Sequence, residues 1–76
     1  MLGEDFDAVC REVASLVARD FPGAAPEQFR VVLEWEGGNW VAFARTRSSN
    51  TRLYAVSHPL PGGALARLKD RCLAHR

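Results

Sequence analysis

The stretch FRVVLEWEGGNWVAFAR, residues 29–45, decides the fold, because two runs with alternating apolar residues flank a pair of glycines. Successive side chains of a strand point to opposite sides, so the first run predicts a strand from Phe29 to Glu36. One face of that strand carries Phe29, Val31, Leu33 and Trp35. Gly37, Gly38 and Asn39 all tolerate a positive φ angle, and this property favours a tight reversal. The sequence therefore predicts a β-hairpin.

The length of this turn decides which face each side chain of the second strand, Trp40 to Arg47, occupies. A three-residue turn pairs Leu33 with Phe43, so that Phe43 joins the apolar face of the first strand. A two-residue turn instead puts both tryptophans on the same side, because a slip of one residue moves every side chain to the opposite face. We build on the three-residue turn, although the periodicity leaves both registers open.

Outward from the hairpin, the polar turn Ser48–Thr51 leads to a third strand, Arg52 to His58. Apolar residues at steps of three and four predict a helix from Asp5 to Asp20, which Pro22 and Gly23 end. A similar pattern predicts a short helix after Gly63. The predicted fold is α+β: a three-stranded antiparallel β-meander flanked by two helices in α-β-β-β-α order, forming one small domain over residues 1–76. The expected core consists of Phe6, Val9, Val13, Leu16, Val31, Leu33, Phe43, Leu65 and Leu68.

The charges and the cysteines narrow the class of protein. Residues 1–36 hold three bases against eight acids, a net charge of −5, and residues 37–76 hold seven bases against one acid, a net charge of +6. The two cysteines, Cys10 and Cys72, are too few and too far apart for a secreted disulfide scaffold, so we expect both to be buried and unpaired. The start of the chain is acidic and no apolar run is long enough to span a bilayer, so we expect a cytoplasmic protein without membrane contact.

Residues that support catalysis or metal binding are sparse. A soft metal would have to be held by Cys10, His58, Cys72 and His75, but only Cys72 and His75 have ligand-like spacing. Cys10 with His58 is the best nucleophile and base pair, and Glu34 with Glu36 is the best carboxylate pair. A buried thiol and a solvated strand face explain these residues more simply. We therefore predict no enzyme activity, no metal site and no cofactor.

Three arginines, Arg45, Arg47 and Arg52, surround the turn between the second and third strands and form a basic hairpin tip. Guanidinium groups bind phosphate in a forked geometry, so nucleic-acid binding is the alternative function. The explanation that we favour is a solvated loop whose arginines pair with the acidic first helix, in the same molecule or in a neighbouring one. The order of elements resembles that of the double-stranded-RNA-binding domain. That resemblance implies phosphate contacts from a lysine-rich start of the second helix, where this chain has residues 62–67, GGALAR.

The face opposite the expected core is unusually apolar for a solvated surface. Antiparallel sheets normally alternate apolar and polar residues when one side meets water, so we expect this side to be covered too. One helix on each face would cover it; we favour both helices on one face and a partner against the other. The expected partner-binding residues are Val32, Ala42, Ala44, Leu53 and Ala55. The sequence thus predicts a small non-enzymatic protein-interaction module whose partner is a protein, in the first instance a second copy of the chain.

Overall fold

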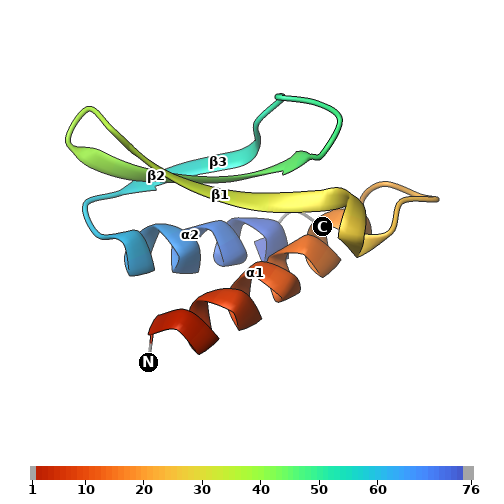
Figure 1. Cartoon of the computed structure of the whole chain (residues 1–76), viewed down its shortest axis with the longest axis horizontal. Coiled ribbons are helices and arrows are strands. Elements are labelled where there is room, and N and C mark those ends of the chain that lie inside the picture. Colours follow the sequence, from red (N-terminus) through yellow and green to blue (C-terminus); the bar gives the residue numbers. More distant parts are fainter. Residues whose placement is uncertain (1, 75–76) are drawn as a thin grey trace.

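The computed structural model describes residues 2–74 and the side chains of residues 6–74. The elements are α1 (Leu2–Ala18), the 3-10 turn η1 (Pro26–Gln28), β1 (Phe29–Glu36), β2 (Asn39–Thr46), β3 (Leu53–His58) and α2 (Pro61–Ala74). The strands form one antiparallel sheet in the order β1-β2-β3 (Figure 1). The predicted α+β fold with α-β-β-β-α order is therefore confirmed. His75 lies outside the described residues.

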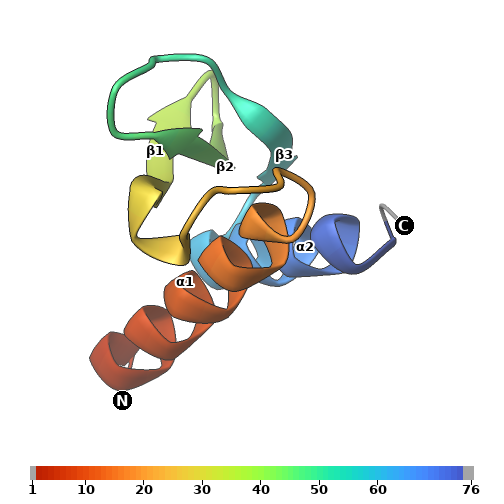
Figure 2. The ribbon, with the colours of Figure 1, turned by 90° about the vertical axis from the view of Figure 1, so that its right-hand side faces the viewer.

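Both helices pack against the same face of the sheet, so the molecule has two layers (Figures 1 and 2). α1 lies below β1 and slopes away from the sheet toward its N-terminus, while α2 runs below β3. Val13 and Val17 of α1 and Leu68 of α2 have no exposed surface. Their spacing along each helix puts one apolar stripe on the side that faces the sheet. The opposite face of the sheet has no helix over it among the described residues, and we call it the open face.

The turn between β1 and β2 has two residues, so the three-residue turn is wrong and the register left open beside it is correct. Gly37 and Gly38 have φ angles of 56° and 90°, the conformation that makes a two-residue turn match the twist of its strands. Trp35 consequently lies opposite Trp40. The side chains of β2 are therefore on the faces opposite to those expected.

The register explains how the core forms. Ala42 and Ala44 of β2 face the helices and are fully buried. Their small side chains allow the helix layer to approach the sheet closely, with Ala64 of α2 also fully buried. Phe43 points to the open face and is not a member of the helix-covered core. The prediction that Phe43 belongs to that core is wrong, because it depended on the longer turn.

β3 is an irregular edge strand. Its pairing with β2 shifts between Ala42 and Ala44, and Tyr54 there has a positive φ of 59°. A non-glycine residue with this conformation is uncommon and here accompanies a β-bulge. The bulge lets the Tyr54 hydroxyl donate a 2.8 Å hydrogen bond to Asp20, just after α1. Tyr54 therefore ties the β3 edge to the end of the first helix.

This contact predicts a loss of stability at alkaline pH. Burial, the hydrogen bond to Asp20 and the charge of Asp20 raise the pKa of Tyr54 to about 12. Because an unfolded tyrosine ionises near pH ~10, the folded state holds its proton more tightly than the unfolded state between these two values. The contribution of Tyr54 to the free energy of unfolding is fully present below pH ~10 and is lost as the pH rises through the folded pKa.

We expect the urea midpoint to fall over this pH range in the native protein and to fall less in Tyr54→Phe, which has no phenol to ionise. Tyr54 is the single tyrosine of the chain, so phenolate absorbance reports its titration directly. Titration of the folded protein at the unfolded value would contradict the assignment.

Candidate protein-interaction surface

The five residues expected to bind a partner do not form one surface. Ala42 and Ala44 are covered by the chain's own helices, and Leu53 is half-buried against the same core. Val32 is half-buried opposite Phe43 on the open face, and Ala55 is exposed. The expectation of a single face depended on the three-residue turn. The shorter turn separates these residues between the two sides of the sheet.

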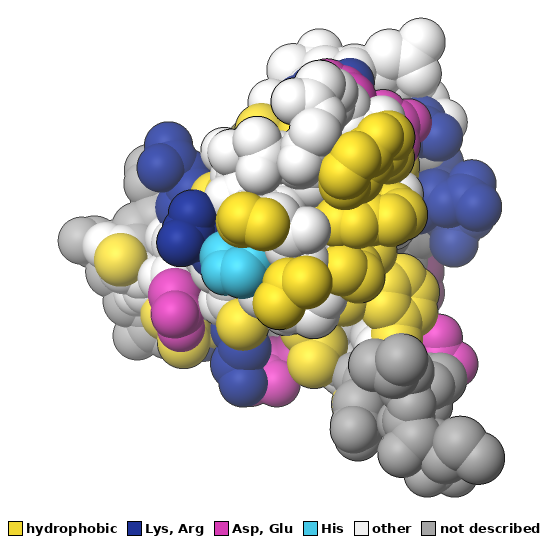
Figure 3. All heavy atoms as spheres, turned by 90° about the vertical axis from the view of Figure 1, so that its left-hand side faces the viewer, with side chains coloured by type: hydrophobic (Ala, Val, Ile, Leu, Met, Phe, Trp, Pro, Cys, Tyr) yellow, Lys and Arg dark blue, Asp and Glu magenta, His cyan; other side chains and the backbone are white. Residues whose placement is uncertain are grey.

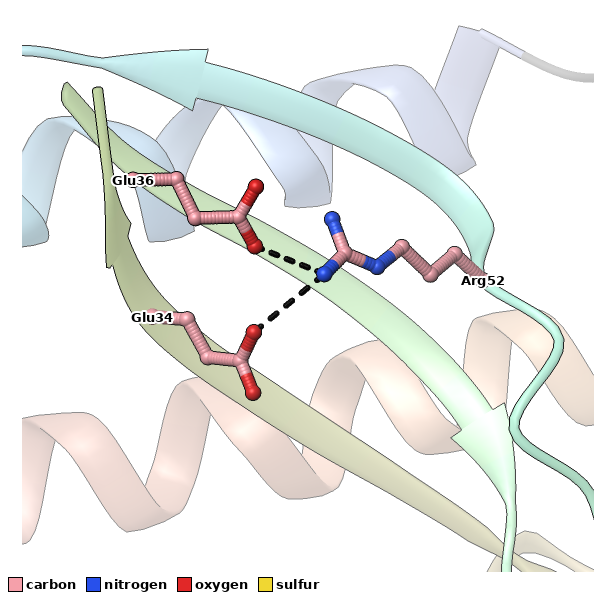
Figure 4. Close-up of polar contacts among 3 residues, drawn as sticks. All are labelled: Glu34, Glu36 and Arg52. Atoms are coloured by element: carbon pink, nitrogen blue, oxygen red, sulfur yellow. Dashed lines mark hydrogen bonds and ion pairs between the residues drawn. The ribbon is translucent and has the colours of Figure 1, made fainter.

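A charged cluster covers much of the open face. The Arg52 guanidinium lies 4.5 Å from the centre of the Phe43 ring and bonds Glu36 at 2.6 Å and Glu34 at 3.3 Å (Figure 4). The hydrogen bond from Arg52 holds the pKa of Glu36 below its usual value. Phe43 is only 4% exposed beneath this cover. The open face is therefore sealed largely by polar groups of the chain itself.

The three arginines of the predicted basic tip have separate partners within the chain. Arg52 is held by the carboxylates of β1, as Figure 4 shows. Arg47 donates a 2.9 Å hydrogen bond to the carbonyl of Glu27 in η1. Arg45 makes 3.4 Å contacts with Ser49 and Asn50 in the following turn. None of these partners belongs to α1, so the expected pairing with the first helix of the same molecule is wrong for these contacts. The pairing with the first helix of a neighbouring molecule stays a prediction.

The cysteines are placed as structural groups rather than as nucleophiles. Both are unpaired; Cys72 is buried as expected, whereas Cys10 is only half-buried. Burial raises the pKa of both thiols, and the thiolate is the nucleophilic form. His58 is occupied locally, since its Nδ1 atom accepts a 3.0 Å hydrogen bond from the Leu60 amide. Among residues 6–74, no group of three or more possible metal ligands comes together.

An apolar surface lies at the end of the molecule that carries the β1–β2 turn. We call it the end surface and define it by Trp35, Trp40 and Leu60. Trp35 is 57% exposed and Leu60 is 64% exposed, and the two indole rings meet edge to face with their centres 5.5 Å apart. Figure 3 shows hydrophobic side chains gathered in a continuous band at this end. Exposed apolar patches of this kind are typical of interaction sites.

The free edge of β1 adjoins the end surface. Gln28 accepts a hydrogen bond from the Arg47 amide, and a two-residue turn makes Glu36 and Asn39 a hydrogen-bonded pair. Because hydrogen bonding alternates along a strand, the even-numbered residues of β1 bond to β2 and the odd-numbered residues point their backbone groups outward. The Phe29 amide already bonds to Pro26. The outward groups that remain are the amides and carbonyls of Val31, Leu33 and Trp35, and the carbonyl of Phe29.

A hollow of about 640 Å³ lies beside this edge, between α1 and β1. Cys10 and Ala14 line it from the helix, and Phe29 and Val31 line it from the strand. The hollow is therefore at the opposite end of the β1 edge from Trp35. An added strand could place its inward side chains over this space.

The end surface and the β1 edge are the features that the sequence reasoning missed. The available signal was the two adjacent glycines, which favour the short turn, together with a first strand that has neither lysine nor proline.

Within residues 2–74, no helix has both the length and the apolar character needed to cross a bilayer. Comparison with known proteins finds no matching family model, no significantly similar curated protein and no significantly similar solved structure.

Proposed function

We propose that this chain is a small non-enzymatic protein-interaction module that acts by associating with a second copy of itself. The observation that carries the proposal is the unpaired edge of β1, eight residues long and adjacent to the exposed Trp35. Proteins normally protect long edge strands with lysine, proline or bulges, and β1 has none of these devices. An edge of this kind supports binding by addition of a strand.

The size of the domain gives a second argument for association. A chain of 76 residues buries a smaller fraction of its surface on folding than a larger domain does. Each Å² of apolar surface that association removes from water stabilises the assembly by about 25 cal/mol. Trp35 and Leu60 offer this surface without any change of fold. Tryptophan is also one of the residues that most often dominates the energy of an interface. Two unpaired thiols agree with the reducing, cytoplasm-type compartment that we propose for the module.

Nucleic-acid binding through Arg45, Arg47 and Arg52 is the alternative, and the local geometry argues against it. Each guanidinium group already bonds to the chain itself, and the carboxylates of Glu34 and Glu36 beside Arg52 place negative charge where a phosphate would bind. Binding of this kind would weaken steeply with added salt, whereas apolar association would not. Binding measured at increasing salt concentrations therefore distinguishes the two functions.

The test measures molar mass by sedimentation from low to high micromolar concentration. The mass should rise from 8.4 kDa toward twice that value. Trp35→Ser should weaken association about tenfold or more, because it removes the most exposed aromatic side chain of the site. Leu73→Ser is the matched control: Leu73 is 42% exposed but lies on α2, outside the end surface.

A wild-type protein that stays monomeric at every concentration would overturn the proposed function. A salt-sensitive shift with a short duplex, lost in Arg47→Gln, would then support the nucleic-acid alternative. Equal association of the wild type and Trp35→Ser would show that the end surface is not part of the contact.

A further inference from the structure

We infer that two copies join through their β1 strands, antiparallel about a two-fold axis, with Val32 of one copy opposite Val32 of the other. The two sheets then form one continuous six-stranded sheet. This inference rests on the proposed function and names the contact that performs it.

The backbone restricts which residues can face each other. Only the odd-numbered residues of β1 present hydrogen-bonding groups outward, so a second β1 must pair odd residues with odd residues. With Val32 on the two-fold axis, Val31 pairs with Leu33 of the second copy and Phe29 pairs with its Trp35. The available groups then form about six hydrogen bonds between the strands.

The charges on the open face select this register. Arg30 lies directly opposite Arg45 of its own sheet, and like charges in that position repel. Within the described residues the Arg30 side chain has no hydrogen bond or ion pair. The proposed register places Glu34 of the second copy opposite Arg30, and it does so twice because of the two-fold symmetry. The second copy thus supplies the acid that the chain itself does not place beside Arg30.

Neighbouring registers satisfy these groups less well. A slip of two residues toward the turn pairs Arg30 with Glu36 of the second copy but places Glu34 opposite the apolar Val32. A slip in the other direction places Arg30 opposite Val32 and leaves Glu34 beyond the partner's charge. Only the register centred on Val32 matches apolar with apolar and acid with base at every open-face position from 30 to 34.

The helix side of the new contact offers an apolar floor for the indole. The pairing of Phe29 with Trp35 of the second copy brings that indole to the end of the edge where the hollow lies. Ala14, Cys10 and Phe29 contribute apolar surface to the hollow, and charged side chains such as Asp7 and Arg11 also line it. Two-fold symmetry seats both Trp35 rings in the same way, each in the partner's hollow.

A charge exchange tests the register. Arg30→Glu and Glu34→Arg each place like charges opposite one another twice, so each variant alone should self-associate at least about tenfold more weakly. A mixture of the two variants should associate as a heterodimer, since both pairs are then of opposite charge. The double variant Arg30→Glu/Glu34→Arg should also recover self-association. Loss of the Glu34–Arg52 contact cannot explain such a recovery, because that contact stays missing in the Glu34→Arg copy of the mixture and in both copies of the double variant.

A disulfide at the symmetry axis gives an independent readout. Residues opposite one another at a non-hydrogen-bonded position have Cα atoms about 4.5 Å apart, within the range that a disulfide spans. Val32→Cys should therefore cross-link to itself under mild oxidation, and peptide mass should locate the bond at position 32. Arg30→Cys and Glu34→Cys should each fail alone and cross-link when mixed.

Two failures lead to different conclusions. If the wild type dimerises but Val32→Cys does not cross-link and the mixed charge variants show no recovery, the proposed two-fold contact is wrong while self-association stands. If the wild type is monomeric at every concentration, the contact and the proposed function fail together.

Discussion

Ala44→Glu is expected to unfold the domain. Ala44 has no exposed surface and lies between β2 and the helix layer, where no basic side chain of the described residues is buried to receive the new carboxylate. Burying an unpaired charge costs several kcal/mol. The whole stability of a small domain is about 5–15 kcal/mol and tends toward the lower value at this size. Far-UV circular dichroism and thermal melting would detect the loss.

Ala55→Glu is the matched control for this substitution. Ala55 is exposed on β3, so the same change of side chain there leaves the added carboxylate in water. The control should retain a cooperative transition close to that of the wild type. If Ala44→Glu melted like the control, the two-residue turn and the placement of β2 would both be wrong.

Leu68→Ala should produce the second large effect, a loss of about 2–5 kcal/mol in the free energy of unfolding. Leu68 is among the largest fully buried side chains and lies in the middle of α2. Shortening it leaves a cavity in the core that only partial collapse can fill. Chemical denaturation would measure this loss as a lower urea midpoint.

Leu73→Ala separates this core effect from a general effect of leucine in a helix. The Leu73 side chain is 42% exposed, and alanine has a slightly higher helix propensity than leucine. We expect a change of less than about 1 kcal/mol for this control. Similar losses for the two variants would mean that α2 presents a different stripe to the sheet.

The elements of this fold could be predicted from local patterns. Val9, Val13 and Val17 recur at helical steps, and the alternation from Phe29 to Trp35 has the period of a strand. The register could not be fixed in the same way, because both faces of β2 are apolar: Ala42 and Ala44 are on one, Val41 and Phe43 on the other. The glycine pair favours the two-residue turn, and packing against the helices agrees with it, because the smaller residues are the ones that fit there.

The candidate site was harder to predict than the fold. The apolar residues expected at an interface include Ala42 and Ala44, which the two-residue turn buries inside the chain. Trp35 belongs to the alternating face of β1 but lies next to the end of the sheet, where it remains exposed. Periodicity reports the side of a strand and contains no information about how far a helix covers it. The intrachain bonds of Arg47 and Arg52 likewise depend on segments that are distant in sequence.

The bulge in β3 determines how large an assembly built on β1 can become. A dimer joined at its two β1 strands has β3 at both outer edges. Each of these edges is interrupted at Tyr54 and followed by Pro59, features that hinder the docking of another strand. Open-ended polymerisation of the kind that produces fibres needs an edge that can be extended repeatedly. The irregular β3 edge therefore hinders further strand addition, and the expected assembly is a dimer.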